Sequence, residues 1–65
     1  MKLILNGEPH ETSQKTVNGL LAELAIQPER VAVEVNLAII RRVEFDRFQL
    51  NDGDAVEIVN FVGGG

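Results

Sequence analysis

The sequence of 65 residues predicts one α+β domain, in which a mixed sheet of four to five strands has one main helix packed on one face. Three observations lead to this fold class. A β-hairpin signal opens the chain, a single amphipathic helix pattern follows, and the remainder alternates between strand patterns and turn residues. We expect the first and last strands to lie side by side and parallel in the centre of the sheet.

The hairpin is expected at the start of the chain. Lys2–Leu5 is short and apolar, and Asn6-Gly7 follows it. This dipeptide favours a two-residue turn because both turn positions need a positive φ. Residues 8–12 then form the return strand. Pro9 cannot donate a ladder hydrogen bond, so this strand is expected at an edge of the sheet or with a bulge.

One helix is expected after the hairpin. Thr16 suits the N-cap position because its hydroxyl can accept a hydrogen bond from a free amide of the first turn. Gly19 lies inside the helix, where it costs about 1 kcal/mol relative to alanine, and Pro28 closes the region. The apolar positions follow the helical spacing, and they are Val17, Leu20, Leu21 and Leu24. These four side chains are expected to form the buried face.

Strand and turn patterns fill the rest of the chain. Val31–Val35 has its large apolar residues at odd positions, which is typical of a strand with one buried face. The elements that follow are a turn at 36–38, a short strand at 39–40, an irregular crossover at 41–48, a turn at 51–54 and the last strand at 55–61. The aromatic side chains of the crossover are expected to anchor it to the core.

Composition excludes several classes of function. Six basic residues face ten acidic ones, for a net charge of −4, so nucleic acid is not an expected partner. The longest unbroken apolar run has four residues, at 37–40, far short of the roughly 20 that a membrane helix needs. Cysteine is absent, which excludes disulfides and thiolate metal sites and favours a reducing compartment. A cytoplasmic protein without membrane contact is expected.

Groups that could perform catalysis are scarce. His10 is the only histidine and is expected to be an exposed polar strand residue, while the single serine, Ser13, lies in a connector. Asp52 and Asp54 flank a glycine and are interpreted as turn formers. No phosphate-binding glycine loop or set of metal ligands is recognisable. We therefore expect that the chain is not an enzyme and binds no metal or cofactor itself.

The C-terminal end is the most distinctive feature. We expect a domain at residues 1–61 and a flexible glycine-rich tail at 62–65, in which Gly63, Gly64 and Gly65 have no side chain. Such a tail can enter a narrow channel of another enzyme and present the Gly65 carboxylate there. Four residues reach at most about 13–14 Å. The alternative interpretation is a frayed terminus without function.

Residues 52–65 resemble the C-terminal signature of the ThiS family, the sulfur carrier proteins of thiamine thiazole biosynthesis, which are relatives of ubiquitin. The turn Asn6-Gly7-Glu8, the helix start Thr16-Val17, the pair Leu20-Leu21 within the helix and the strand segment 33–36 also fit this family. The resemblance implies a ubiquitin-like β-grasp fold. Asn60 and the Leu37-Ala38 turn depart from the usual family pattern.

The resemblance also implies a chemistry in which the chain supplies no catalytic group. An adenylyltransferase of the ubiquitin-activating type would use ATP to adenylate the Gly65 carboxylate. A sulfur donor protein would then displace AMP and leave a thiocarboxylate, whose sulfur passes to thiazole synthase. Val62, Gly63 and Gly64 would thread into the active site of the partner.

The last strand indicates a docking face. Val56 and Ile58 share one side and are expected in the core, so Val59 and Phe61 project from the other side. Together with Ile4 they are expected to form an exposed apolar patch that binds partners. The alternative is that Phe61 folds back onto its own sheet.

Two other functions remain open at this point. One is a sulfur carrier of another pathway, of the type of the small subunit of molybdopterin synthase. The other is a non-covalent ubiquitin-like binding module, in which the glycine tail has no chemical role.

Overall fold

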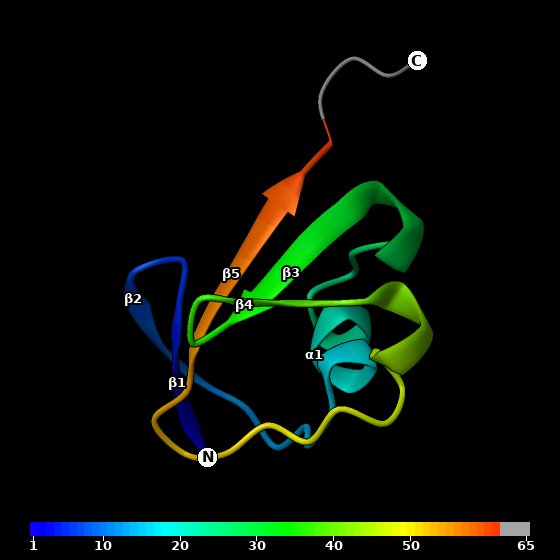
Figure 1. The fold of residues 1–65 in the computed structure, drawn as a ribbon. Coiled ribbons are helices and arrows are strands. Elements are labelled where there is room, and N and C mark those ends of the chain that lie inside the picture. Colours follow the sequence, from blue (N-terminus) through cyan, green and yellow to red (C-terminus); the bar gives the residue numbers. More distant parts are fainter. Residues whose placement is uncertain (62–65) are drawn as a thin grey trace.

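A computed structural model describes residues 1–61 of the chain (Figure 1). The expectations for Val62, Gly63, Gly64 and Gly65 lie outside these residues. The elements, in chain order, are β1 (Lys2–Leu5), β2 (Glu8–Glu11), α1 (Val17–Glu23), the 3-10 helix η1 (Pro28–Arg30), β3 (Val31–Val35), β4 (Ala38–Ile40), the 3-10 helix η2 (Arg42–Glu44) and β5 (Ala55–Asn60). This order agrees with the expected hairpin, helix, strand, crossover and strand.

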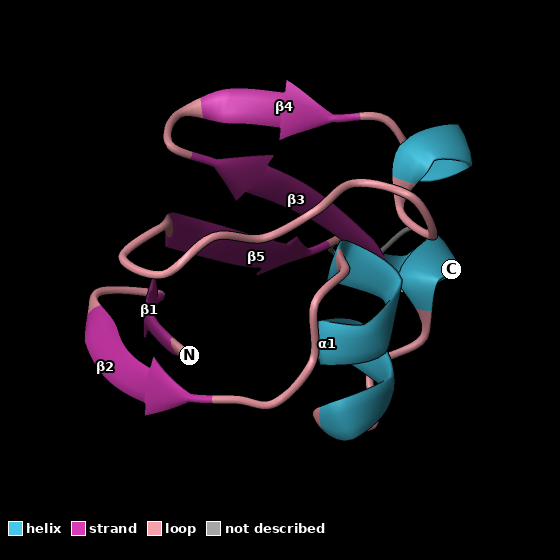
Figure 2. Cartoon of the chain, turned by 90° about the horizontal axis from the view of Figure 1, so that it is seen from below, coloured by secondary structure: helices cyan, strands magenta, loops and turns pink. Residues whose placement is uncertain are grey.

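The sheet has five strands in the order β2-β1-β5-β3-β4, and β5 is its centre. β1 and β5 are parallel and adjacent, as expected, whereas β2 pairs with β1, β3 with β5, and β4 with β3 in antiparallel fashion. Helix α1 lies against one face of the sheet (Figure 2). A mixed sheet that holds one helix on one face is the β-grasp arrangement, so the predicted fold class is confirmed.

Helix α1 begins where the sequence predicts. The Thr16 hydroxyl accepts a hydrogen bond from the Gly19 amide at 3.0 Å. A Cβ at Gly19 would lie 2.6 Å from Gln14 Oε1 and 3.2 Å from Thr16 Oγ1, so the loop before the helix packs closely on this position. The Gln14 amide group is the end of a flexible side chain and can move, so the firmer restraint on a larger residue is the hydroxyl of the N-cap Thr16. The helix ends at Glu23, and Leu24 is its C-cap and only partly buried.

The core lies between α1 and the sheet. Its largest fully buried side chains come from β1, α1, β3 and β5, and they are Leu3, Leu20, Leu21, Val17, Val33 and Val56. The crossover after β4 contributes buried Phe45 and Leu50, and Phe48 packs against the cluster while partly buried. The expectation that aromatic residues anchor the crossover is therefore confirmed.

Two tight turns join antiparallel strands. Asn6 and Gly7 have φ values of 48° and 85°, as the predicted turn requires. Val35 pairs directly with Ala38, so the second turn contains only Asn36 and Leu37, with φ values of 52° and 74°. The predicted turn at 36–38 is thus one residue too long, and β4 begins at Ala38 instead of residue 39.

Two other predicted strands are one residue too long. β2 ends at Glu11, one residue before the prediction, although the Thr12 backbone still exchanges hydrogen bonds with Met1 at 2.8 and 2.9 Å. β5 ends at Asn60, although the Phe61 amide still donates to the Arg30 carbonyl oxygen at 2.9 Å. Pro9 lies on the edge strand β2, where its missing donor removes no ladder bond.

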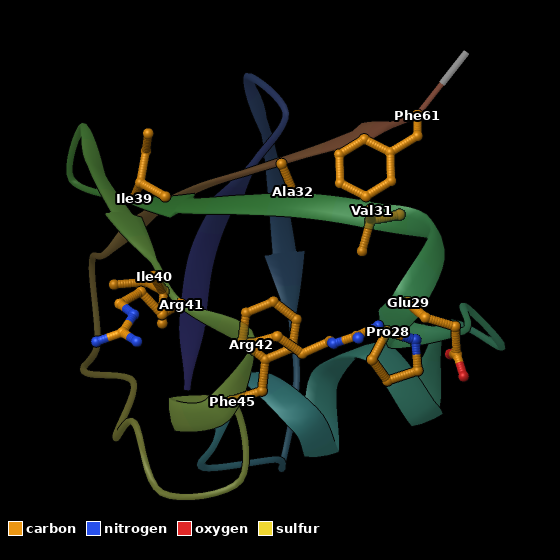
Figure 3. Close-up of a pocket in the computed structure, with 10 residues that line it drawn as sticks. All are labelled: Pro28, Glu29, Val31, Ala32, Ile39, Ile40, Arg41, Arg42, Phe45 and Phe61. Atoms are coloured by element: carbon orange, nitrogen blue, oxygen red, sulfur yellow. The ribbon is translucent and has the colours of Figure 1, made fainter. Parts of the chain in front are cut away.

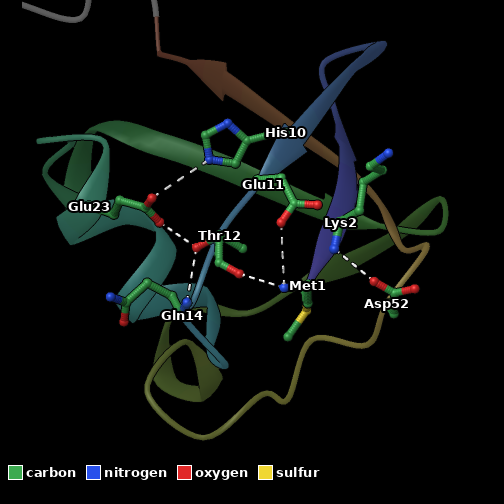
Figure 4. A network of polar contacts seen from close by, with 8 residues as sticks. All are labelled: Met1, Lys2, His10, Glu11, Thr12, Gln14, Glu23 and Asp52. Atoms are coloured by element: carbon green, nitrogen blue, oxygen red, sulfur yellow. Dashed lines mark hydrogen bonds and ion pairs between the residues drawn. The ribbon is translucent and has the colours of Figure 1, made fainter.

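A polar network ties β2 to α1 (Figure 4). Buried Thr12 donates to Glu23 and accepts from the Gln14 amide at 3.0 Å. His10 Nε2 lies 3.9 Å from Glu23 Oε2, and its side chain is 26% exposed. The expectation of an exposed strand residue is wrong for His10, because the register places it opposite fully buried Leu3, on the helix side of the sheet.

Candidate functional site

The strand that leads to the C-terminus is held from both sides. β5 is the central strand of the described sheet, with β1 parallel to it on one side and β3 antiparallel to it on the other. Its pairing with β3 extends from Val56 to Asn60, opposite Val35 to Val31. The strand therefore provides a rigid support, and Phe61 marks the position from which residues 62–65 continue.

Two turn asparagines extend the support of β5 beyond the ladders. Asn6 Oδ1 accepts from the Ile58 amide at 2.8 Å, and Asn6 Nδ2 donates to the Ile58 carbonyl oxygen at 3.4 Å. Asn36 Oδ1 accepts from the Ala55 amide at 3.0 Å. In each case the side chain replaces a strand partner where the neighbouring strand has already turned away. Sequence reasoning assigned both residues to turns through their backbone and missed these side-chain contacts.

The facing of β5 agrees with the sequence. Val56 is 1% exposed, and Ile58 is partly buried against the core, whereas Val59 is 54% and Phe61 64% exposed. Ile4 is 39% exposed. Phe61 does not fold back to become buried, so the three residues of the expected docking face are all accessible to a partner.

The register separates this face into two zones. Ile4 pairs with Ala55, four residues before Val59 along β5, which corresponds to about 13 Å of strand. Val59 pairs with Ala32 of β3 and is followed by Phe61 near the end of the sheet. Ile4 therefore does not adjoin the other two residues as a single continuous patch. The apolar surface next to the tail consists of Val59, Phe61 and Ala32.

Two carboxylates lie between these zones. Glu57 of β5 is directly opposite Glu34 of β3, and Ile39 of β4 is the next residue in the same row. Among the described residues, neither glutamate forms an ion pair. Like charges directly opposite each other weaken a sheet. The sequence pattern placed Glu57 on the outer side of its strand but contained no register from which the pair could be predicted.

Other kinds of site have little support in the structure. No group of three or more histidine, aspartate or glutamate side chains within residues 1–61 could hold a metal ion. The helices formed by this part of the chain are too short or too polar to cross a membrane. The features that remain are the end of β5, its exposed apolar side chains and the carboxyl-terminal residues that follow them.

The β-grasp fold, with its final strand at the centre of the sheet, places the chain in the class of ubiquitin-like proteins. The model of the ThiS family matches residues 3–65, and the chain belongs to this family. The crystal structure of the thiamine biosynthesis protein (ThiS) from Geobacter metallireducens superimposes with a TM-score of 0.86, at 40% identity and full coverage of both chains. The resemblance noted from the sequence is thereby confirmed.

Curated relatives include short proteins and longer ones. The sulfur carrier protein ThiS of Bacillus subtilis is 38% identical over 65 residues, which cover 97% of this chain and 98% of the relative. The thiazole synthase of Paramagnetospirillum magneticum is 47% identical over 66 residues, which cover all of this chain but 20% of that protein. The chain thus spans about a fifth of that longer relative, and a segment similar to it lies within a thiazole synthase polypeptide.

Proposed function

We propose that this chain is a sulfur carrier for thiazole formation in thiamine biosynthesis, and that the Gly65 carboxylate is the group that carries sulfur. The observation that supports this most strongly is the family match, which extends through residue 65 and so includes the glycine end. Relatives of nearly the same length are named sulfur carrier proteins. This favours the thiazole pathway over a carrier of the molybdopterin type and over a non-covalent binding module.

The proposed chemistry takes place in partner enzymes. A carboxylate is a poor electrophile at neutral pH, because its usual pKa is near 3.5 and it carries a negative charge. An adenylyltransferase of the ubiquitin-activating type would let the carboxylate attack the α-phosphorus of ATP, with release of pyrophosphate. Sulfur delivered by a sulfur donor protein at the oxidation level of sulfide would then attack the acyl carbon and displace AMP, which leaves a thiocarboxylate at Gly65. The carrier contributes no catalytic group and binds no cofactor of its own.

The contribution of the chain is to position its end. β5 is fixed by two strands and by Asn6 and Asn36, so the root of the tail has a defined direction. Gly63 and Gly64 have no side chains that could obstruct a narrow entrance. Val59 and Phe61 beside this root offer apolar contacts, and Ile4 offers a more distant one.

Thiazole synthase is the proposed acceptor of the sulfur. Two thiazole synthases contain a segment 46–47% identical to this chain, which favours a direct interaction between the carrier and such an enzyme. The adenylyltransferase and the sulfur donor protein are proposed from the chemistry that a carboxylate requires. Because the sequence has no cysteine and the proposed activation consumes ATP, we place the carrier in the cytoplasm.

An extended variant tests the need for a free carboxylate. One alanine added after Gly65 converts the carboxylate into a peptide bond, so the extended protein should receive no sulfur at Gly65. Its thermal midpoint should stay unchanged, since the addition lies outside the core. The assay is thiazole formation with purified partners, and mass spectrometry checks that the added alanine is still present. Full activity of the unprocessed extended protein would contradict the proposed mechanism.

A further inference from the structure

A groove opens at the edge of the sheet beside Phe61 (Figure 3). Its volume is about 480 Å³. Val31, Ile40 and Phe45 form its floor and are almost completely buried, so only a small part of each is accessible from the groove. Phe61 lines the groove from the end of the sheet. The floor is therefore apolar and belongs to the rigid core.

The groove exists because β4 is shorter than β3. Their pairing begins with Val35 opposite Ala38 and stops with Val33 opposite Ile40. The chain then turns away into η2. Val31 and Ala32 have strand partners in β5 but none in β4, and the Val31 amide donates to the Pro28 carbonyl oxygen within the chain. The space left beside these residues exposes the apolar floor, on which the side chains of an extended segment can pack.

Arginine side chains give the groove a charge opposite to that of the whole protein. Arg41 and Arg42 line it, with Glu29 as the one acidic lining residue, whereas the chain has a net charge of −4. Among residues 1–61, neither arginine forms an ion pair or a side-chain hydrogen bond. In Figure 3 the side chain of Arg42 extends toward Pro28, whereas that of Arg41 points away in the opposite direction. The two unpaired guanidinium groups thus lie on opposite sides of the apolar floor.

The position of the groove relative to the tail limits what can cover it. Phe61 is both a lining residue of the groove and the last residue before 62–65. Four residues span at most about 13–14 Å. An enzyme that receives the Gly65 carboxylate must therefore place its entrance close to the end of β5. Its surface around that entrance then lies next to the groove.

We propose that the groove binds an extended acidic segment of the adenylyltransferase that activates the chain. One carboxylate of that segment would pair with Arg42 and a second with Arg41, and an apolar side chain between them would lie over Val31 and Phe45. Charge complementarity, the apolar floor and the short tail all favour this occupant. The inference rests on the proposed function, because it assumes that the tail enters this enzyme.

Charge reversal with a matched control tests the inference. The full-length chain is used with ATP and the adenylyltransferase of the ubiquitin-activating type encoded in the same genome. In the double variant Arg41→Glu/Arg42→Glu, the KM for the carrier should rise on the order of tenfold, while kcat stays unchanged. The control Lys15→Glu/Arg47→Glu makes the same change in net charge at exposed residues that do not line the groove.

Two further measurements separate binding from folding and from general charge. Circular dichroism melting should show both double variants folded at the assay temperature, and Arg41→Gln/Arg42→Gln replaces the first variant if it is not. Added sodium chloride should raise the KM of the wild type more than that of the groove variant, because the wild type has more charge pairing to lose.

The outcomes are distinct. A rise in KM that is confined to the groove variant supports the inference. An unchanged KM for the groove variant, or an equal rise in the control, overturns it and leaves the proposed function intact. Absence of adenylation of the wild-type chain overturns the proposed function itself, and the inference with it.

Discussion

Phe61 is the last described residue of the fold and lies where we propose that partner enzymes bind. It is 64% exposed, so its ring contributes little to the core, yet it lies at the root of the tail and beside the groove. Exposed aromatic residues are enriched among interface residues that dominate binding energy. Its neighbours along the strand have different roles, since Val56 is buried and Ile58 packs against the core while partly buried.

We predict that Phe61→Ala weakens binding to the adenylyltransferase or thiazole synthase by roughly 1–3 kcal/mol. Its free energy of unfolding should change by less than about 0.5 kcal/mol, as for most surface substitutions. The control is Ile58→Ala, which removes contacts with the core and should cost about 2 kcal/mol of stability. Calorimetric affinity and thermal unfolding of both variants are the measurements. Equal destabilisation by the two substitutions would show that Phe61 is a structural residue.

Leu37 has a conformation that its side chain disfavours. Its φ is 74° and its side chain is 89% exposed, so no contact compensates for the left-handed backbone. Leu37→Gly should raise the free energy of unfolding by about 0.5–1 kcal/mol, because the relief of about 1–2 kcal/mol exceeds the entropic cost of glycine. Leu37→Ala keeps a Cβ and should change little. Urea unfolding decides this, and a less stable glycine variant would contradict the argument.

At the scale of the element, β5 depends on groups outside the strand ladders. Asn6 makes two hydrogen bonds with the backbone of Ile58, at a point where β1 has already ended. This arrangement continues the support of β5 toward the tail. It is achieved by a side chain that belongs to a turn, so the turn residue has a second role that its φ alone does not require.

Asn6→Gly should therefore lower the free energy of unfolding by about 1 kcal/mol, the usual net value of a neutral hydrogen-bonded contact, because glycine adopts the φ of 48° without the strain that alanine would add. The control is Asn60→Ala, since Asn60 is exposed on the same strand and makes no side-chain hydrogen bond within residues 1–61. Hydrogen exchange should show faster opening at the Ile58 amide in the Asn6 variant alone. Unchanged exchange there would mean that the side chain does not support the strand.

Elements were predictable where the residue pattern is regular. β1, β3 and the start of α1 occur as predicted, because alternation, an Asn-Gly turn and a threonine cap are local signals. The short turn at Leu37 was not predictable, because this sequence places a leucine where glycine is preferred. The groove and the Glu34–Glu57 pair depend on the register between distant strands, which no local pattern contains.

In the molecule as a whole, the residues that stabilise the fold are separate from the group that we propose reacts. The core between α1 and the sheet comes from residues 3–56, whereas the proposed reactive group is the carboxylate of Gly65. A protein of this kind can change its modification state without repacking its interior. In the proposed function, the exposed apolar side chains near the end of β5 and the arginines of the groove select the partner enzymes.

The most direct measurement is the intact mass of the chain after incubation with its adenylyltransferase, ATP and a sulfur donor. We predict a gain in mass that corresponds to the exchange of one oxygen for sulfur, and fragmentation should assign this gain to Gly65. Omission of ATP should abolish it, because an unactivated carboxylate does not react. An unchanged mass with partners known to be active, or a modification at any residue other than Gly65, would contradict the proposal that the chain carries sulfur at its C-terminus.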